Sequence, residues 1–119
     1  MATYAPLLLS GAGAGGRVVV VAATATPGTL IHTAVSGAVS WDEIYLWVSN
    51  VTAAAATLTI EWGGVTDPAD HMVKGLSVPA NSPPIAIVTG IRLNNGLIIR
   101  AFSATASALN ITGNVNRIA

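Results

Sequence analysis

Short stretches in which apolar and polar residues alternate dominate this chain and direct it toward β-sheet folds. In residues 57–62, Leu58, Ile60 and Trp62 alternate with two threonines and a glutamate. A period of two places the apolar side chains on one face of a strand. The segments that we expect as strands are residues 17–21, 29–35, 43–49, 57–62, 72–78, 85–88, 97–102 and 109–115. The one helix-friendly stretch, residues 53–56, is too short to form a stable helix.

Glycine, proline and asparagine separate these stretches. Pro27-Gly28 ends the first valine-rich region, and Gly63-Gly64 ends the strand expected at residues 57–62. Asn95-Gly96 lies between two apolar runs and predicts a hairpin, because both residues of such a turn need positive φ. About eight strands at this spacing predict an all-β, single-domain antiparallel β-sandwich, jelly-roll-like, or a small barrel.

The first sixteen residues differ in composition from the rest. They join an apolar segment, residues 4–9, to a glycine-rich stretch, residues 10–16, which is typical of a flexible connection. We therefore expect a flexible N-terminal arm at residues 1–16 and a β-sandwich domain at residues 17–119. An apolar arm has little reason to stay in water. It packs either on its own domain or on a neighbouring subunit, and the sequence leaves both alternatives open.

The chain carries few charges for its size. Hydrophobic residues make up 52% and charged residues 8%, whereas a typical soluble domain has about 25% charged residues. Five basic and five acidic residues cancel, which argues against nucleic-acid binding because that requires a cationic patch. The most apolar region, residues 4–25, contains Arg17 and four glycines, so we expect no membrane-spanning segment. Cysteine is absent, which excludes disulfides and thiolate chemistry.

Few residues are arranged as a catalytic or metal-binding motif would require. The sequence has no P-loop and no H-E-x-x-H motif, and we expect neither enzymatic activity nor a cofactor. Asp67, Asp70 and His71 are the best metal candidates, because carboxylates and an imidazole can together bind a divalent ion. The alternative, which we adopt, is a solvated loop whose aspartates make turn hydrogen bonds. Asp42 and Glu43 are adjacent and would point to opposite faces of a strand, unlike a catalytic pair.

The aromatic residues allow two interpretations. Trp41, Tyr45, Trp47 and Trp62 could form a platform on which sugars stack on one face of a sandwich. Alternatively, Trp47 and Trp62 fill the core or a contact between subunits. We adopt the second interpretation and keep the first as the rival.

The scarcity of charge indicates that other protein covers part of the surface. Ten charged residues fall well short of the about 25–35% that keeps the surface of a small domain soluble. Large exposed apolar patches usually mark interfaces, and closed symmetric oligomers are the usual solution. We therefore expect a homo-oligomer or attachment to a larger partner.

Five segments carry a resemblance to a known class of protein: Ile31–Ala34, Asp42–Trp47, Leu58–Gly64, Asn95–Ala101 and Asn114–Ile118. In these segments the chain resembles small structural proteins of tailed bacteriophage virions. The resemblance implies a capsid decoration, or cement, protein that is made in the bacterial host cytoplasm and located on the capsid surface. It implies a homotrimer that binds the major capsid protein and grips the shell through an N-terminal arm. A tail or fibre component with a receptor- or carbohydrate-binding face is the alternative.

This hypothesis predicts which side chains make the assembly contacts. Apolar residues of the arm and one aromatic residue would bury surface, and arginines would bind carboxylates of the shell bidentately. The residues expected at the assembly interface are Tyr4, Leu7, Leu8, Leu9, Arg17, Trp47, Arg92, Arg100 and Arg117.

Overall fold

The computed structural model describes residues 3–13 and 15–119, and all regular secondary structure in this part of the chain is β-strand. The strands are β1 (Tyr4–Leu8), β2 (Val19–Val20), β3 (Thr29–Thr33), β4 (Trp41–Asn50), β5 (Ala56–Trp62), β6 (His71–Val78), β7 (Ser82–Leu93), β8 (Ile98–Phe102) and β9 (Leu109–Ile118). Among the described residues, no helix is long and apolar enough to cross a membrane.

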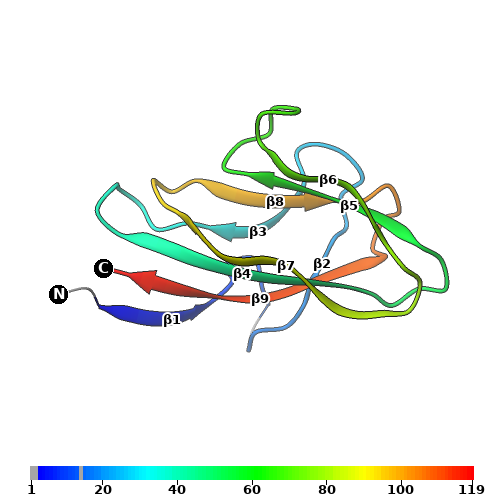
Figure 1. Ribbon diagram of the computed structural model, residues 1–119, viewed down its shortest axis with the longest axis horizontal. Coiled ribbons are helices and arrows are strands. Elements are labelled where there is room, and N and C mark those ends of the chain that lie inside the picture. The colour runs from blue at the N-terminus through cyan, green and yellow to red at the C-terminus, as the bar shows by residue number, and fades with distance from the viewer. Residues whose placement is uncertain (1–2, 14) are drawn as a thin grey trace.

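The strands form two antiparallel sheets that lie one above the other (Figure 1). One sheet has the order β1-β9-β4-β7, with β2 also paired to β9, and the other has the order β3-β8-β5-β6. The predicted all-β sandwich is therefore confirmed.

The order of the strands is that of a jelly roll. β1 and β2 pair with residues 114–118 and 110–111 of β9, so they are two parts of one interrupted edge strand. Counted as one, they leave eight strands, and every connection except β5–β6 passes from one sheet to the other. This alternation between two sheets is the double Greek key of a jelly roll.

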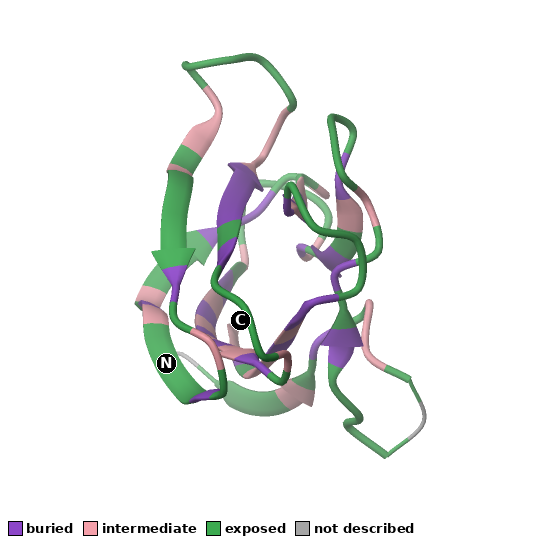
Figure 2. Ribbon diagram, turned by 90° about the vertical axis from the view of Figure 1, so that its right-hand side faces the viewer, coloured by how far each residue is buried: buried purple, intermediate pink, exposed green. Residues whose placement is uncertain are grey.

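The core lies between the sheets and is built by the alternation seen in the sequence. In β4, Ile44, Leu46 and Val48 are fully buried, whereas the residues between them face outward. Burying one such aliphatic side chain contributes about 1.5–3 kcal/mol. Figure 2, viewed along the long axis, shows buried residues on strands of both layers, whereas exposed residues occupy the outer loops and also much of strands such as β1 and β7.

The N-terminal segment belongs to the sandwich, which corrects the predicted arm. β1 pairs in regular register with β9, from Tyr4 opposite Ile118 to Leu8 opposite Asn114. Leu9 follows and is buried in the core. The segment packs on its own domain because β9 offers it a complete set of backbone partners and the core accepts its leucine side chain. The division expected at residue 16 is therefore wrong for residues 3–12; residues 1, 2 and 14 of that arm lie outside the described part.

Residues 9–12, which we call the strap, cross from β1 to the edge of the opposite sheet. The Gly11 N–H donates to the Ile31 carbonyl oxygen at 2.9 Å. A Cβ atom at position 11 would lie 2.3 Å from the Leu30 carbonyl oxygen and 2.6 Å from that of Ile31. Glycine is required here because only a residue without Cβ allows the two backbones to approach so closely.

The Asn95-Gly96 turn forms, but the hairpin predicted around it does not. Both residues have positive φ, 58° and 65°, as the sequence predicted. β7, however, pairs with β4, and β8 pairs with β3 and β5. The turn instead bonds to the loop between β3 and β4. The Asn95 and Gly96 N–H groups donate to the carbonyl oxygens of Gly37 and Val35 in that loop.

Candidate functional site

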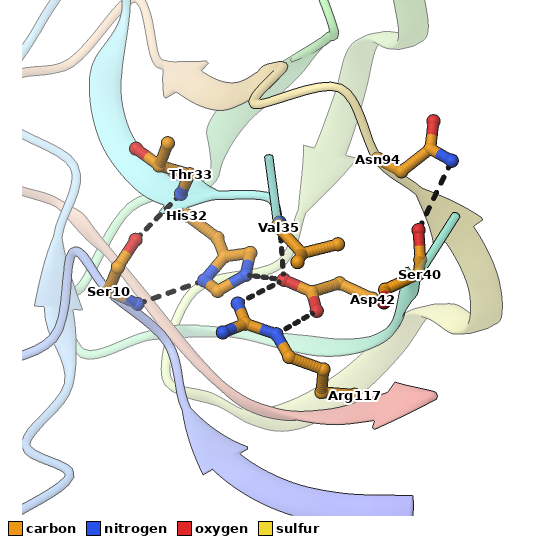
Figure 3. A network of polar contacts seen from close by, with 8 residues as sticks. All are labelled: Ser10, His32, Thr33, Val35, Ser40, Asp42, Asn94 and Arg117. Carbon is orange, nitrogen blue, oxygen red and sulfur yellow. Dashed lines mark hydrogen bonds and ion pairs between the residues drawn. The ribbon is translucent and has the colours of Figure 1, made fainter. Parts of the chain in front are cut away.

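A buried cluster of charged groups joins the two sheets at one end of the sandwich (Figure 3). The Asp42 carboxylate accepts bonds from Arg117 at 2.7 and 2.9 Å, from His32 Nε2 at 2.8 Å and from the Val35 N–H at 3.0 Å. Asp42 and His32 are almost completely buried. The cluster therefore holds a carboxylate that is inaccessible to solvent and has four donors.

The charge of Asp42 is stabilised by its neighbours. Burial alone would raise the pKa of Asp42, but the hydrogen bonds from Arg117 and His32 outweigh that effect and hold the pKa below the ordinary 3.8. The hydrogen bond to Asp42 in turn raises the pKa of Arg117. Asp42 is therefore ionised at neutral pH, and its role is to bind three elements of the fold together.

The same cluster contains the residue types of a catalytic triad in an arrangement that does not suit catalysis. The backbone N–H of Ser10 donates to His32 Nδ1 at 3.0 Å, so Nε2 carries the hydrogen donated to Asp42. The Ser10 hydroxyl oxygen accepts a bond from the Thr33 N–H at 2.6 Å. A triad needs the serine hydroxyl on the imidazole, whereas here the imidazole meets the backbone. This cluster fastens the strap to β3.

A second buried carboxylate, Glu61 on β5, is also fully used by the fold. It accepts bonds from the Thr26 hydroxyl at 2.5 Å and from the Gly28 N–H at 2.6 Å. A Cβ atom at Gly28 would meet the Ala101 backbone at 2.6–2.8 Å, so glycine is needed for this segment to cover Glu61. Asp42 and Glu61 are both buried and therefore contribute nothing to the already sparse charge on the surface.

Exposed apolar side chains line the edge formed by β1 and β2. Tyr4, Leu8, Val18 and Val20 are between 44% and 62% exposed. We call these four residues the N-terminal edge. They are large apolar groups in water, and their grouping along one edge makes this edge a candidate for contact with other protein.

The N-terminal edge is poorly equipped to extend the sheet. Thr3 and Ala119 exchange both backbone hydrogen bonds, so the even-numbered residues of β1 turn their N–H groups away from β9. Pro6 occupies one of these outward positions and has no N–H to donate. Contact along this edge is therefore better made by side chains than by an added strand.

The outer face of β4 carries three aromatic residues. Trp41, Tyr45 and Trp47 alternate with the buried residues of the strand, and Trp41 is 39% exposed. Trp62 lies in the other sheet and packs against the core. The four-residue aromatic platform considered from the sequence is therefore corrected to three residues, and the interpretation of Trp62 as a core residue is supported.

Tyr45 is held in place by its neighbours. Its hydroxyl donates to Glu43 Oε1 at 2.7 Å, and this bond raises the pKa of Tyr45 above its ordinary value. Arg92 Nε lies 3.7 Å from Glu43 Oε2. A Cβ atom at Gly90 would lie 3.3–3.6 Å from the Tyr45 hydroxyl and ring atoms. The ring therefore lies across β7 at a position where no side chain intervenes.

Asparagine side chains border the aromatic residues on β9. In the β4–β9 register, Asn114 is opposite Tyr45 and Asn116 is opposite Glu43. Residues directly opposite in an antiparallel pair point to the same face of the sheet. We call Glu43, Tyr45, Trp47, Arg92, Asn114 and Asn116 the polar-aromatic face.

The three metal candidates, Asp67, Asp70 and His71, each have their own contacts within the protein. Asp70 accepts the Thr66 N–H at 3.0 Å, which is the turn hydrogen bond that the solvated-loop interpretation predicted. Asp67 instead makes an ion pair of 2.6 Å with Lys74. The Lys74 hydrogen bond lowers the pKa of Asp67. His71 is buried beside Phe102, with ring centres 6.1 Å apart, and its Nδ1 lies 3.5 Å from Asp67 Oδ1. The described residues contain no group of three or more that could hold a metal ion.

An open pocket of about 230 Å³ lies at the opposite sheet, where the β5–β6 and β7–β8 connections meet. Its volume is below the about 300–1,000 Å³ of typical ligand sites. It is lined by Gly63, Gly64, Val65, Gly96, Leu97, Ile98 and Arg100. Arg100 supplies the one charged side chain of this lining, so the pocket offers a single polar anchor.

The residues predicted at the assembly interface fall into three groups. Tyr4, Leu8, Arg17 and Arg92 are exposed, and Leu7, Trp47 and Arg100 are partly buried. Leu9 is a correction to the prediction, because it is 3% exposed and belongs to the core. Arg117 is partly buried as well, and its guanidinium donates two hydrogen bonds to Asp42. One edge of this guanidinium is therefore used within the fold.

Searches against protein-family models, curated proteins and solved structures found no match to this chain.

Proposed function

We propose that this protein is a structural component of a tailed bacteriophage virion, specifically a non-enzymatic capsid decoration protein. The single observation that carries the proposal is the N-terminal edge, where Tyr4, Leu8, Val18 and Val20 expose apolar surface along one edge of the sandwich. The resemblance of five sequence segments to phage virion proteins supports the same role. The proposed partners are other copies of this chain, in a trimer, and the major capsid protein.

The proposed mechanism is physical rather than chemical. Apolar surface removed from water contributes roughly 25 cal/mol per Å² to association. A subunit that buries the N-terminal edge against neighbouring capsomers raises the free energy needed to separate them. Arg17 is exposed near this edge and is the arginine best placed to bind a carboxylate of the shell.

The charge distribution supports an attached rather than a solitary protein. Asp42 and Glu61 are fully buried, so fewer charges remain to solvate the surface than the sequence suggests. A surface with so little charge is prone to association. Coverage by a shell or by other subunits would remove that liability.

The proposal is tested with capsids that lack decoration protein and with the purified chain. We expect a concentration-independent mass of three subunits by light scattering, and saturable binding to these capsids by sedimentation. Leu8→Asp should abolish capsid binding, whereas Val39→Asp should not, because Val39 is 93% exposed but lies outside the N-terminal edge. Absence of binding by the unmodified chain, or equal loss in both variants, would refute the role.

A second candidate is a tail or fibre component that binds a receptor carbohydrate. The aromatic residues on the outer face of β4 favour it specifically. It differs from the first candidate in requiring a ligand at the polar-aromatic face rather than protein at the N-terminal edge.

A further inference from the structure

We propose that the polar-aromatic face binds an uncharged carbohydrate, with one sugar ring stacked on Tyr45. The inference gives the second candidate function a defined site, and it holds whether or not the chain binds a capsid. It commits to a neutral glycan, because the side chains around Tyr45 provide an aromatic surface and paired hydrogen-bonding groups with no net charge.

The orientation of Tyr45 provides the stacking surface. Its hydroxyl is fixed by Glu43 at 2.7 Å, and its ring lies over the backbone of Gly90. Tyr45 is partly exposed, so part of its side chain remains accessible to solvent. The C–H face of a pyranose packs on such a surface, and little conformational freedom is lost because the ring is already fixed.

Trp47 extends this surface along the strand. It follows Tyr45 by two residues on the same face of β4, which places the two side chains roughly 7 Å apart. Trp47 is partly buried, so its ring position is also restricted. A ligand of more than one sugar unit can therefore contact both rings.

The polar groups around Tyr45 match hydroxyl groups. Glu43 is an acceptor, Arg92 is a donor, and the amides of Asn114 and Asn116 are both. Sugar hydroxyls each donate and accept, so neighbouring hydroxyls can satisfy an amide or a carboxylate together.

The charges of the face argue for a neutral ligand. Glu43 and Arg92 lie 3.7 Å apart and compensate each other. An acidic ligand would meet the Glu43 carboxylate, and a cationic ligand would meet the Arg92 guanidinium. An uncharged ligand meets neither repulsion.

A second copy of the chain is a poorer occupant of this face. Packing the face on itself would bury Glu43, Arg92 and both asparagines against identical groups. A buried polar group that is left without a partner opposes association. The N-terminal edge borders this face, since Leu8 lies opposite Asn114, but its own four side chains are apolar. Self-association is therefore better placed at that edge.

The test is a panel of immobilised neutral and acidic glycans, followed by titration of the strongest hit with free glycan. Tyr45→Ala should weaken binding by at least about tenfold, whereas Tyr45→Phe, which keeps the ring, should stay within about threefold. Thr57→Ala is the matched control, because Thr57 is exposed on the other sheet. Asn114→Ala, which alters an exposed side chain, should weaken binding about fivefold and serves if Tyr45→Ala does not fold.

Capsid binding of the same variants separates this inference from the decoration role. Neutral-glycan binding lost in Tyr45→Ala, with capsid binding retained, supports the site. The inference is overturned by an absence of neutral hits, by a requirement for acidic glycans or by unchanged affinity in both Tyr45→Ala and Asn114→Ala. It is also overturned if Tyr45→Ala dissociates an oligomer, because the face would then be a subunit contact.

Discussion

Two adjacent carboxylates on β4, Asp42 and Glu43, serve opposite sides of the same sheet. Asp42 points inward, is fully buried and accepts four hydrogen bonds. Glu43 points outward, bonds to the Tyr45 hydroxyl and lies within ion-pair distance of Arg92. The first carboxylate has no capacity left for a ligand, whereas the second does.

This difference shows where function can reside in a chain with few charges. A buried carboxylate must be satisfied by the protein itself, or folding would be too costly. Groups that retain hydrogen-bonding capacity are therefore found on the outer faces and edges. The polar-aromatic face and the N-terminal edge are two such regions.

The largest expected effect is the loss of the inward carboxylate. Asp42→Ala should lower the free energy of unfolding by about 3–5 kcal/mol, because it leaves the buried His32 and the Arg117 guanidinium without their partner. Urea denaturation measures this loss. Glu43→Ala is the neighbouring control and should cost less than about 1 kcal/mol. Similar losses in the two variants would show that the inward cluster is not a special source of stability.

Removal of the guanidinium should have a smaller effect that depends on pH. Arg117→Met should cost about 2–3 kcal/mol at neutral pH, less than a fully buried pair because the Arg117 side chain is about one-third exposed. The pKa of Asp42 is lowered in the folded protein, so its contribution is present above pH 3.8 and is lost as the pH falls through the lowered value.

Denaturation of both proteins between pH 2.5 and 7 tests this dependence. The difference in stability between the unmodified protein and Arg117→Met should be largest above about pH 4 and should shrink below it. A difference that grows on acidification would contradict the assigned ionisation of Asp42.

The strap should be sensitive to a single methyl group. Gly11→Ala should cost about 1–3 kcal/mol, because its Cβ atom would overlap the carbonyl oxygens of Leu30 and Ile31 and displace Ser10 from His32. Gly13→Ala is the control, since the nearest atoms to its Cβ would be 3.6 Å away. Thermal unfolding of the two variants gives the comparison, and equal melting temperatures would argue against a strap that is tightly held.

The smallest expected effect is at the outward carboxylate. Glu43→Gln should change the free energy of unfolding by less than about 0.5 kcal/mol, because the group is at the surface and an amide oxygen can still accept from Tyr45. The pKa of Tyr45 should fall toward its ordinary value once the ionised partner is removed, which ultraviolet titration of the phenol measures. An unchanged pKa would show that Glu43 does not hold the ring.

Much of the fold followed from local pattern. The alternation of Leu58 and Ile60 with polar residues predicted a strand, and both side chains are fully buried as expected. The single buried face was wrong for this strand, because Thr59 and Glu61 are buried as well. The Asn95-Gly96 pair predicted the correct turn conformation. Its flanking strands were wrongly paired, because a turn fixes a local bend whereas the hydrogen-bond partners of each strand depend on the packing of the two sheets.

The site was less predictable than the fold. The position of His32 between Leu30 and Ala34 indicates a structural or interface residue, but its link to Asp42 and Arg117 depends on positions up to 85 residues apart, from residue 32 to residue 117. Asn114 and Asn116 were not singled out, since their place beside Tyr45 and Glu43 arises from the β4–β9 register. The alternation of asparagine along β9 was the available signal. It indicated that these side chains share one face of a strand, but not which strand lies beside it.

The sequence by itself determined the class of fold, the inward and outward faces of strands such as β4, and the scarcity of surface charge. These properties depend on the spacing of apolar residues along each segment and on the overall composition, both of which are read directly from the sequence. Only the tertiary structure decided that residues 4–8 complete a sheet, that Leu9 enters the core, that Arg117 pairs with Asp42, and that asparagines flank Tyr45. Each of these depends on which distant segments are neighbours, and that is set by the burial of both sheets together rather than by any one segment.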